Sequence, residues 1–80
     1  MLRWIFQRGP DTLTCAIEAA GDRRSYDLCV LPHWDLSLAT VEHFAAPVTA
    51  LERHAAIAAA LRHAGWKVHY GGRHATRAAA

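Results

Sequence analysis

This 80-residue chain has few cysteines, no long apolar run, and no acidic residue after Glu52. No stretch approaches the roughly 18 consecutive apolar residues that a membrane-spanning helix needs. The opening sequence MLRWIFQRGP carries Arg3 inside a very short apolar run, and no cleavage-site pattern follows it. The only two cysteines are Cys15 and Cys29. We therefore expect a cytoplasmic protein with reduced thiols and no contact with a membrane.

The patterns that usually carry catalysis or metal binding are also missing. There is no pair of carboxylates, and Gly71-Gly72 is too short to be a phosphate-binding loop. Cys15 and Cys29 are expected on opposite faces of the strands, which does not suit a zinc site. Among the histidines, His69 and His74 have a permitted ligand spacing.

Nucleophilic catalysis by a cysteine needs a histidine base within hydrogen-bond reach. The only such pair that the sequence suggests is Cys29 with His33 or His43, and a structural role for the cysteine is the simpler interpretation. We expect no enzyme activity, no catalytic residue, no metal and no cofactor.

Charge is divided unevenly along the chain. Residues 1–52 contain four basic and seven acidic side chains, a net charge of −3, whereas residues 53–80 contain five basic side chains and no acid. Such a segment is a candidate for contact with nucleic acid or an acidic partner, although a basic tail that keeps a small protein soluble is the simpler alternative. The basic side chains are Arg53, Arg62, Lys67, Arg73 and Arg77.

The first part of the chain has the alternation of half-buried strands. Apolar and polar residues alternate in 2–8, 13–19 and 26–31, and the segments between them, 9–11 and 21–24, have turn compositions. Short connections of this kind favour an antiparallel meander. A fourth strand within 36–44 has less distinct faces, so we place it at an edge.

One amphipathic helix is predicted within Phe44–Trp66. Its start is either Pro47 as the first helical residue or a capping box formed by Thr49 and Glu52. Gly65 is suited to the left-handed residue of a Schellman motif, which would let Trp66 contact Leu61. The apolar face comprises Ala50, Leu51, His54, Ile57, Ala58 and Leu61.

These elements predict one α+β domain over residues 1–70: a three- or four-stranded antiparallel β-meander with one C-terminal α-helix packed on one face. Residues 67–70 could add a short extended piece, and residues 71–80 are expected to form a disordered basic tail. A chain of this size buries only about 60% of its unfolded surface, so its stability is marginal unless a dimer interface, a metal or a disulfide adds to it.

Because one helix covers one face of a sheet, the opposite face is expected to stay uncovered. We predict that this face, or the edge of the fourth strand, binds a protein partner or a second copy of the chain, most simply as a homodimer. The candidate contact residues are Ile5, Leu31 and Trp34. Trp34 has two interpretations, since it could instead fold back over the end of the sheet.

The segments Trp4-Ile5-Phe6, Leu13-Thr14-Cys15, Tyr26-Asp27-Leu28 and the ending His54…Leu61…Gly65-Trp66 resemble small bacterial meander-plus-helix domains of unknown function. The resemblance covers residues 1–70 and implies a fold but no activity. The β-β-β-α order also resembles part of double-stranded-RNA-binding domains. Pro47–Glu52, however, lacks the basic helix start which that family uses on phosphate, so nucleic-acid binding is the alternative function.

Overall fold

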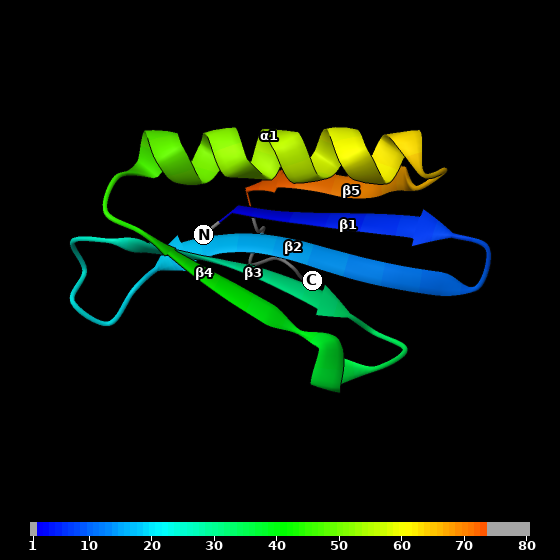
Figure 1. The fold of residues 1–80 in the computed structure, drawn as a ribbon, viewed down its shortest axis with the longest axis horizontal. Helices are drawn as coiled ribbons and strands as arrows, with labels where there is room; N and C mark the ends of the chain where they lie inside the picture. Colours follow the sequence, from blue (N-terminus) through cyan, green and yellow to red (C-terminus); the bar gives the residue numbers. More distant parts are fainter. Residues whose placement is uncertain (1, 74–80) are drawn as a thin grey trace.

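The computed structural model describes the backbone of residues 2–73 and the side chains of residues 2–69. Five strands form a single antiparallel sheet, and one α-helix and a short 3-10 helix complete the described chain (Figure 1). The elements are β1 (Leu2–Arg8), β2 (Asp11–Ala19), β3 (Tyr26–Pro32), η1 (Leu36–Leu38), β4 (Thr40–Phe44), α1 (Pro47–His63) and β5 (Lys67–Arg73). The helix α1 is not long and apolar enough to cross a membrane, and the described residues hold no other helix that is.

The α+β class and the antiparallel meander are confirmed, but the strand count and the position of the helix were predicted wrongly. The strand order is β4-β3-β2-β1-β5, so α1 lies between β4 and β5 in sequence rather than at the C-terminal end. The chain thus crosses from one edge of the sheet to the other through α1 (Figure 1). The strand β5 extends to Arg73, three residues beyond the expected domain boundary, and the expected tail at residues 74–80 lies outside the described residues.

The helix ends as the sequence predicted. Gly65 has a φ of 95°, the Trp66 N–H donates to the Leu61 carbonyl at 2.9 Å, and the Gly65 N–H donates to the Arg62 carbonyl at 3.0 Å. These two bonds form a complete Schellman motif. At the other end, Pro47 is the first helical residue.

The capping box does not form. The Thr49 hydroxyl donates back to the Ala46 carbonyl at 2.8 Å instead of accepting an N–H bond.

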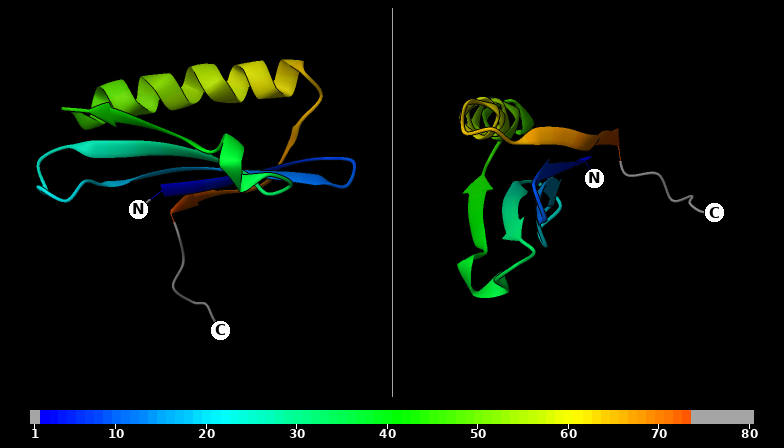
Figure 2. Two further views of the ribbon diagram at one scale, coloured as in Figure 1. Left: turned by 60° about the horizontal axis from the view of Figure 1, so that its bottom comes forward. Right: turned by 90° about the vertical axis from the view of Figure 1, so that its right-hand side faces the viewer.

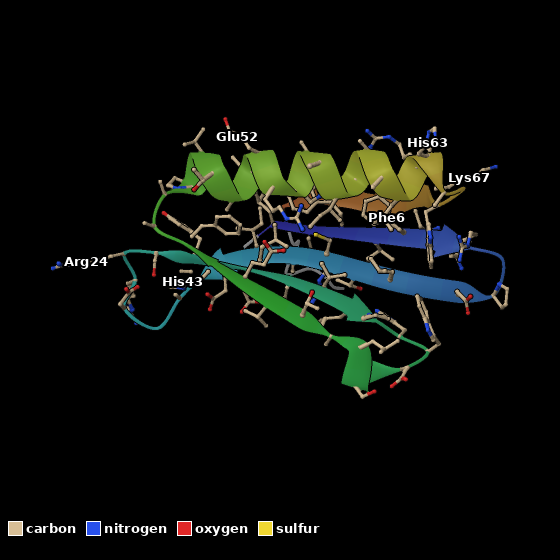
Figure 3. All side chains as sticks on the ribbon, in the orientation of Figure 1. Phe6, Arg24, His43, Glu52, His63 and Lys67 are labelled. Carbon is tan, nitrogen blue, oxygen red and sulfur yellow. The ribbon has the colours of Figure 1, made fainter. Side chains whose placement is uncertain are left out.

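The hydrophobic core lies between α1 and one face of the sheet. Its most buried large side chains are Phe6 and Leu28, and Figure 3 shows Phe6 between the helix and β1, while Glu52 and His63 point away from the sheet. The helix contributes small or compact side chains, Ala50, His54 and Ala58, which allow close packing. Leu51, expected on the buried face, is exposed at the margin of the helix contact. The remaining members of the core are Leu13, Cys15, Ile17 and Trp66.

Candidate protein-interaction surfaces

The face of the sheet opposite α1 is not covered by any other element of the described chain (Figure 2). The strand register places its residues in rows, because directly paired residues share a face. One row is Ile5–Thr14–Leu31. Together with the next row it forms what we call the open face: Arg3, Ile5, Thr14, Ala16, Cys29, Leu31 and Val41.

The open face has an apolar centre and polar surroundings. Thr14 and Ala16 are buried by their neighbours, whereas Ile5 and Leu31 are half-buried. At one end of the face, the row Glu18–Asp27–His43 is polar, and His43 Nδ1 lies 2.8 Å from Asp27 Oδ1. An apolar centre with a polar rim is the usual composition of a protein interface.

Trp34 lies away from the open face, so it does not share a contact surface with Ile5 and Leu31 as the sequence predicts. Its ring stacks on that of Trp66, with 5.7 Å between ring centroids and an interplanar angle of 22°. The Arg8 guanidinium lies 4.7 Å from the centroid of Trp66 and donates to the Ala64 carbonyl at 3.0 Å. Because Trp66 belongs to the core beneath α1, Trp34 covers the end of the sheet on the helix side.

A second exposed apolar surface lies at the β4 edge. We define the edge patch as Leu36, Leu38 and Val41, with exposed fractions of 66%, 55% and 63%. The two leucines belong to η1, immediately before β4, and Val41 lies in β4 itself. Asp35 caps η1, since its Oδ1 accepts from the Ser37 N–H at 3.0 Å. The edge patch therefore sits on an ordered turn.

An apolar hollow of about 190 Å³ opens beside the first turns of α1. It has room for about one small ring or branched alkyl group. No local pattern in the sequence points to it, because its walls come from separate segments of the chain: Leu2, Ile17, Glu18, Ala19, Tyr26, Pro47 and Leu51.

The five basic residues predicted as a possible contact surface are not equally available to a partner. Arg53 Nε donates to both carboxylate oxygens of Glu42 at 3.1 Å, which ties α1 to β4. Arg62 and Lys67 are exposed near the C-terminal end of α1. Arg73 is the last residue of β5, and Arg77 lies outside the described residues.

Nucleophilic chemistry has little support from the geometry. Cys15 lies in the core, and burial, with smaller contributions from Cys29 and Glu42, raises its pKa to about 11. Burial also raises the pKa of Cys29, and both cysteines are free thiols. The Thr14 hydroxyl lies 2.7 Å from His33 Nε2, but Thr14 is buried among the side chains of the open face.

His54 is the one buried histidine among the described side chains, and it lies in the helix-sheet core. Its ring stacks on Trp4, with 3.4 Å between centroids and an interplanar angle of 27°. Its Nε2 is buried without a hydrogen-bond partner in the described part of the chain. Burial, and secondarily the positive charge of Arg62, lowers the pKa of this imidazole.

Within residues 2–73 no group of three or more metal-ligating side chains comes together. Comparisons with protein-family models, with curated proteins and with solved structures find no match to this chain.

Proposed function

We propose that this chain is a small non-enzymatic protein-interaction or assembly module whose open face binds a protein partner, either another protein or a second copy of itself. The observation that carries the proposal is the uncovered sheet face, with Ile5 and Leu31 half-buried around the centre formed by Thr14 and Ala16. A partner layer would bury the rest of Ile5 and Leu31. Each square ångström of apolar surface removed from water contributes roughly 25 cal/mol.

The composition of the open face and the small size of the domain support the same function. An antiparallel sheet with one solvated face usually shows polar residues there, whereas the two central rows of this face hold apolar or small residues at most positions. The chain is also small, and a domain of this size gains stability when a partner covers apolar surface.

A photo-crosslinking experiment tests this function. A benzoylphenylalanine introduced at Leu31 should crosslink the chain to a protein in cells that produce it, whereas the same group at Ala59, on the exposed side of α1, should not. Ile5→Thr in the crosslinker-bearing chain should reduce the adduct, since threonine keeps the strand preference but removes apolar area. Equal crosslinking from positions 31 and 59 would contradict the proposal.

Nucleic-acid binding is the second candidate, and one cluster favours it. Trp34 is half-exposed on its stack with Trp66, and Arg8 lies over Trp66. Stacking aromatic side chains beside cations are the usual means of binding single-stranded nucleic acid.

A titration with a single-stranded oligonucleotide separates this candidate from the first. It should quench tryptophan fluorescence, with an affinity that falls steeply with salt. Trp34→Ala should abolish the response, and binding that is independent of salt and of Trp34 would exclude this candidate.

A further inference from the structure

The two edges of the sheet are built differently. At the β5 edge, the register with β1 shifts between Ile5 and Phe6, and the strand begins with Lys67. A bulge and an edge lysine are both common protections against pairing with another chain. At the β4 edge, all five residues pair with β3 in unbroken register, from Tyr26↔Phe44 to Val30↔Thr40, and the strand contains neither proline nor lysine.

The unprotected edge is also where exposed apolar side chains gather. Leu36, Leu38 and Val41 lie within six residues of one another on η1 and β4. Two leucines exposed in an ordered turn, next to an edge strand with free backbone groups, are the usual features of a strand-pairing surface.

We propose that a second copy of this chain occupies the β4 edge, by antiparallel pairing of β4 with its own copy about a twofold axis that passes Val41. This inference rests on the proposed function, because it names one partner and the place where that partner binds. A twofold axis brings the same patch of both copies together, so the edge must be complementary to itself.

The residue order of the edge meets this requirement when Val41 is at the centre. Val41 then faces Val41 of the second copy, Thr40 faces Glu42, and Ala39, which is extended although it lies just outside β4, faces His43. The apolar Val41 side chains meet at the centre, and no like charges stand opposite each other.

Other centres fit less well. A centre at Glu42 places two carboxylates directly opposite each other, and a centre at His43 places the charged Glu42 opposite the apolar Phe44. Like charges in directly opposed positions destabilise a strand pair. The twofold axis must also pass through a residue position. An axis between two residues would place neighbours such as Val41 and Glu42 opposite each other, although their side chains point to opposite faces of the sheet.

The pairing would produce one ten-stranded sheet, with both copies of α1 on one face and both open faces joined on the other. The open face therefore remains available for the partner in the proposed function. A five-residue strand pair is small beside the roughly 1,000 Å² that a specific interface buries. We accordingly expect Leu36 and Leu38 to supply part of the contact and the dimer to dissociate on dilution.

Disulfide trapping tests both the dimer and its register. In a Cys29→Ser background, which removes the thiol that pairs across the strands with position 41, Val41→Cys should give a disulfide-linked dimer under mild oxidation. Opposed residues have Cα atoms about 4.5–5.5 Å apart, within disulfide reach. The matched control is His43→Cys in the same background: its two copies would lie four residues apart along the strands, about 13 Å, and should not link.

Sedimentation velocity provides the second measurement. The wild-type chain should show a concentration-dependent dimer, and Val41→Lys should weaken it at least about tenfold. Val48→Lys, at a similarly exposed valine outside the edge patch, should leave it unchanged. Circular dichroism should show that each variant remains folded.

Two outcomes would overturn the inference: stronger disulfide linkage in the His43→Cys variant than in the Val41→Cys variant, or a wild-type chain that stays monomeric at millimolar concentration. Either result leaves the proposed function standing if crosslinking from position 31 still captures a protein. Linkage in the Val41→Cys variant, together with no adduct from position 31, would support the dimer and remove the open face from the proposed function.

Discussion

The buried histidine His54 should make the stability of this protein depend on pH. Its ring is packed against Trp4, and its Nε2 has no hydrogen-bond partner among the described residues. Because burial and the charge of Arg62 lower its pKa, the folded state holds the neutral ring at a pH where the unfolded chain is protonated. Protonation therefore favours unfolding.

The sign and the pH window follow from the direction of the shift. Stability from the neutral ring is fully present above the unfolded pKa of about 6.5 and is lost as the pH falls through the folded-state pKa. Between these two pKa values, one proton changes the free energy of unfolding by about 1.4 kcal/mol per pH unit. Such a slope matters, since domains have roughly 0.05–0.15 kcal/mol of stability per residue.

Substituting His54 by leucine removes the titrating group and the unpaired nitrogen together. His54→Leu should unfold in urea within about 1.5 kcal/mol of the wild type at pH 8, because the volume is similar. It should lose the acid-dependent slope that the wild type shows below a pH of about 6.5. The control, Ala59→Gln, changes an exposed residue of the same helix that has no titrating group, and it should keep the wild-type slope. Identical slopes in the wild type and His54→Leu would refute this reasoning.

Three further predictions concern other parts of the fold. Phe6→Ala, at a fully buried side chain, should cost about 3–5 kcal/mol in urea unfolding; a loss below about 1 kcal/mol would contradict its place in the core. Gly65→Ala should cost about 1–2 kcal/mol from its positive φ, since the added Cβ meets only Arg8 Cδ at an ordinary 3.7 Å; an unchanged midpoint would argue against the Schellman geometry. In the native chain, a thiol reagent should modify the half-buried Cys29 before the buried Cys15, and equal rates would contradict the burial of Cys15.

Local signals in the sequence were sufficient for much of this fold. The alternation in β1, β2 and β3 predicted their faces, and their bounds to within about two residues, because a half-buried strand repeats every two residues. Pro47 and Gly65 marked the ends of α1 through backbone chemistry that acts within a few residues. The opposite faces of Cys15 and Cys29 followed from the same alternation and are confirmed by the register.

The strand β5 could not be assigned with the same certainty, for a physical reason. Its sequence, KVHYGGR, contains two glycines and one bulge, so the two-residue period is interrupted. The pairing that makes it a strand is with β1, at the other end of the chain, and no local pattern reports such a contact. The same limit applies to Trp34, whose position depends on the distant Trp66.

The placement of β1 between β2 and β5 has a consequence for how the chain is synthesised. Of these five strands β1 leaves the ribosome first, and it gains its second neighbour only when β5 emerges, after the whole helix has been made. Until then one side of β1 is an open template, and contacts so distant in sequence form slowly. Nascent chains stalled before Lys67 should therefore be the species most prone to aggregate during translation.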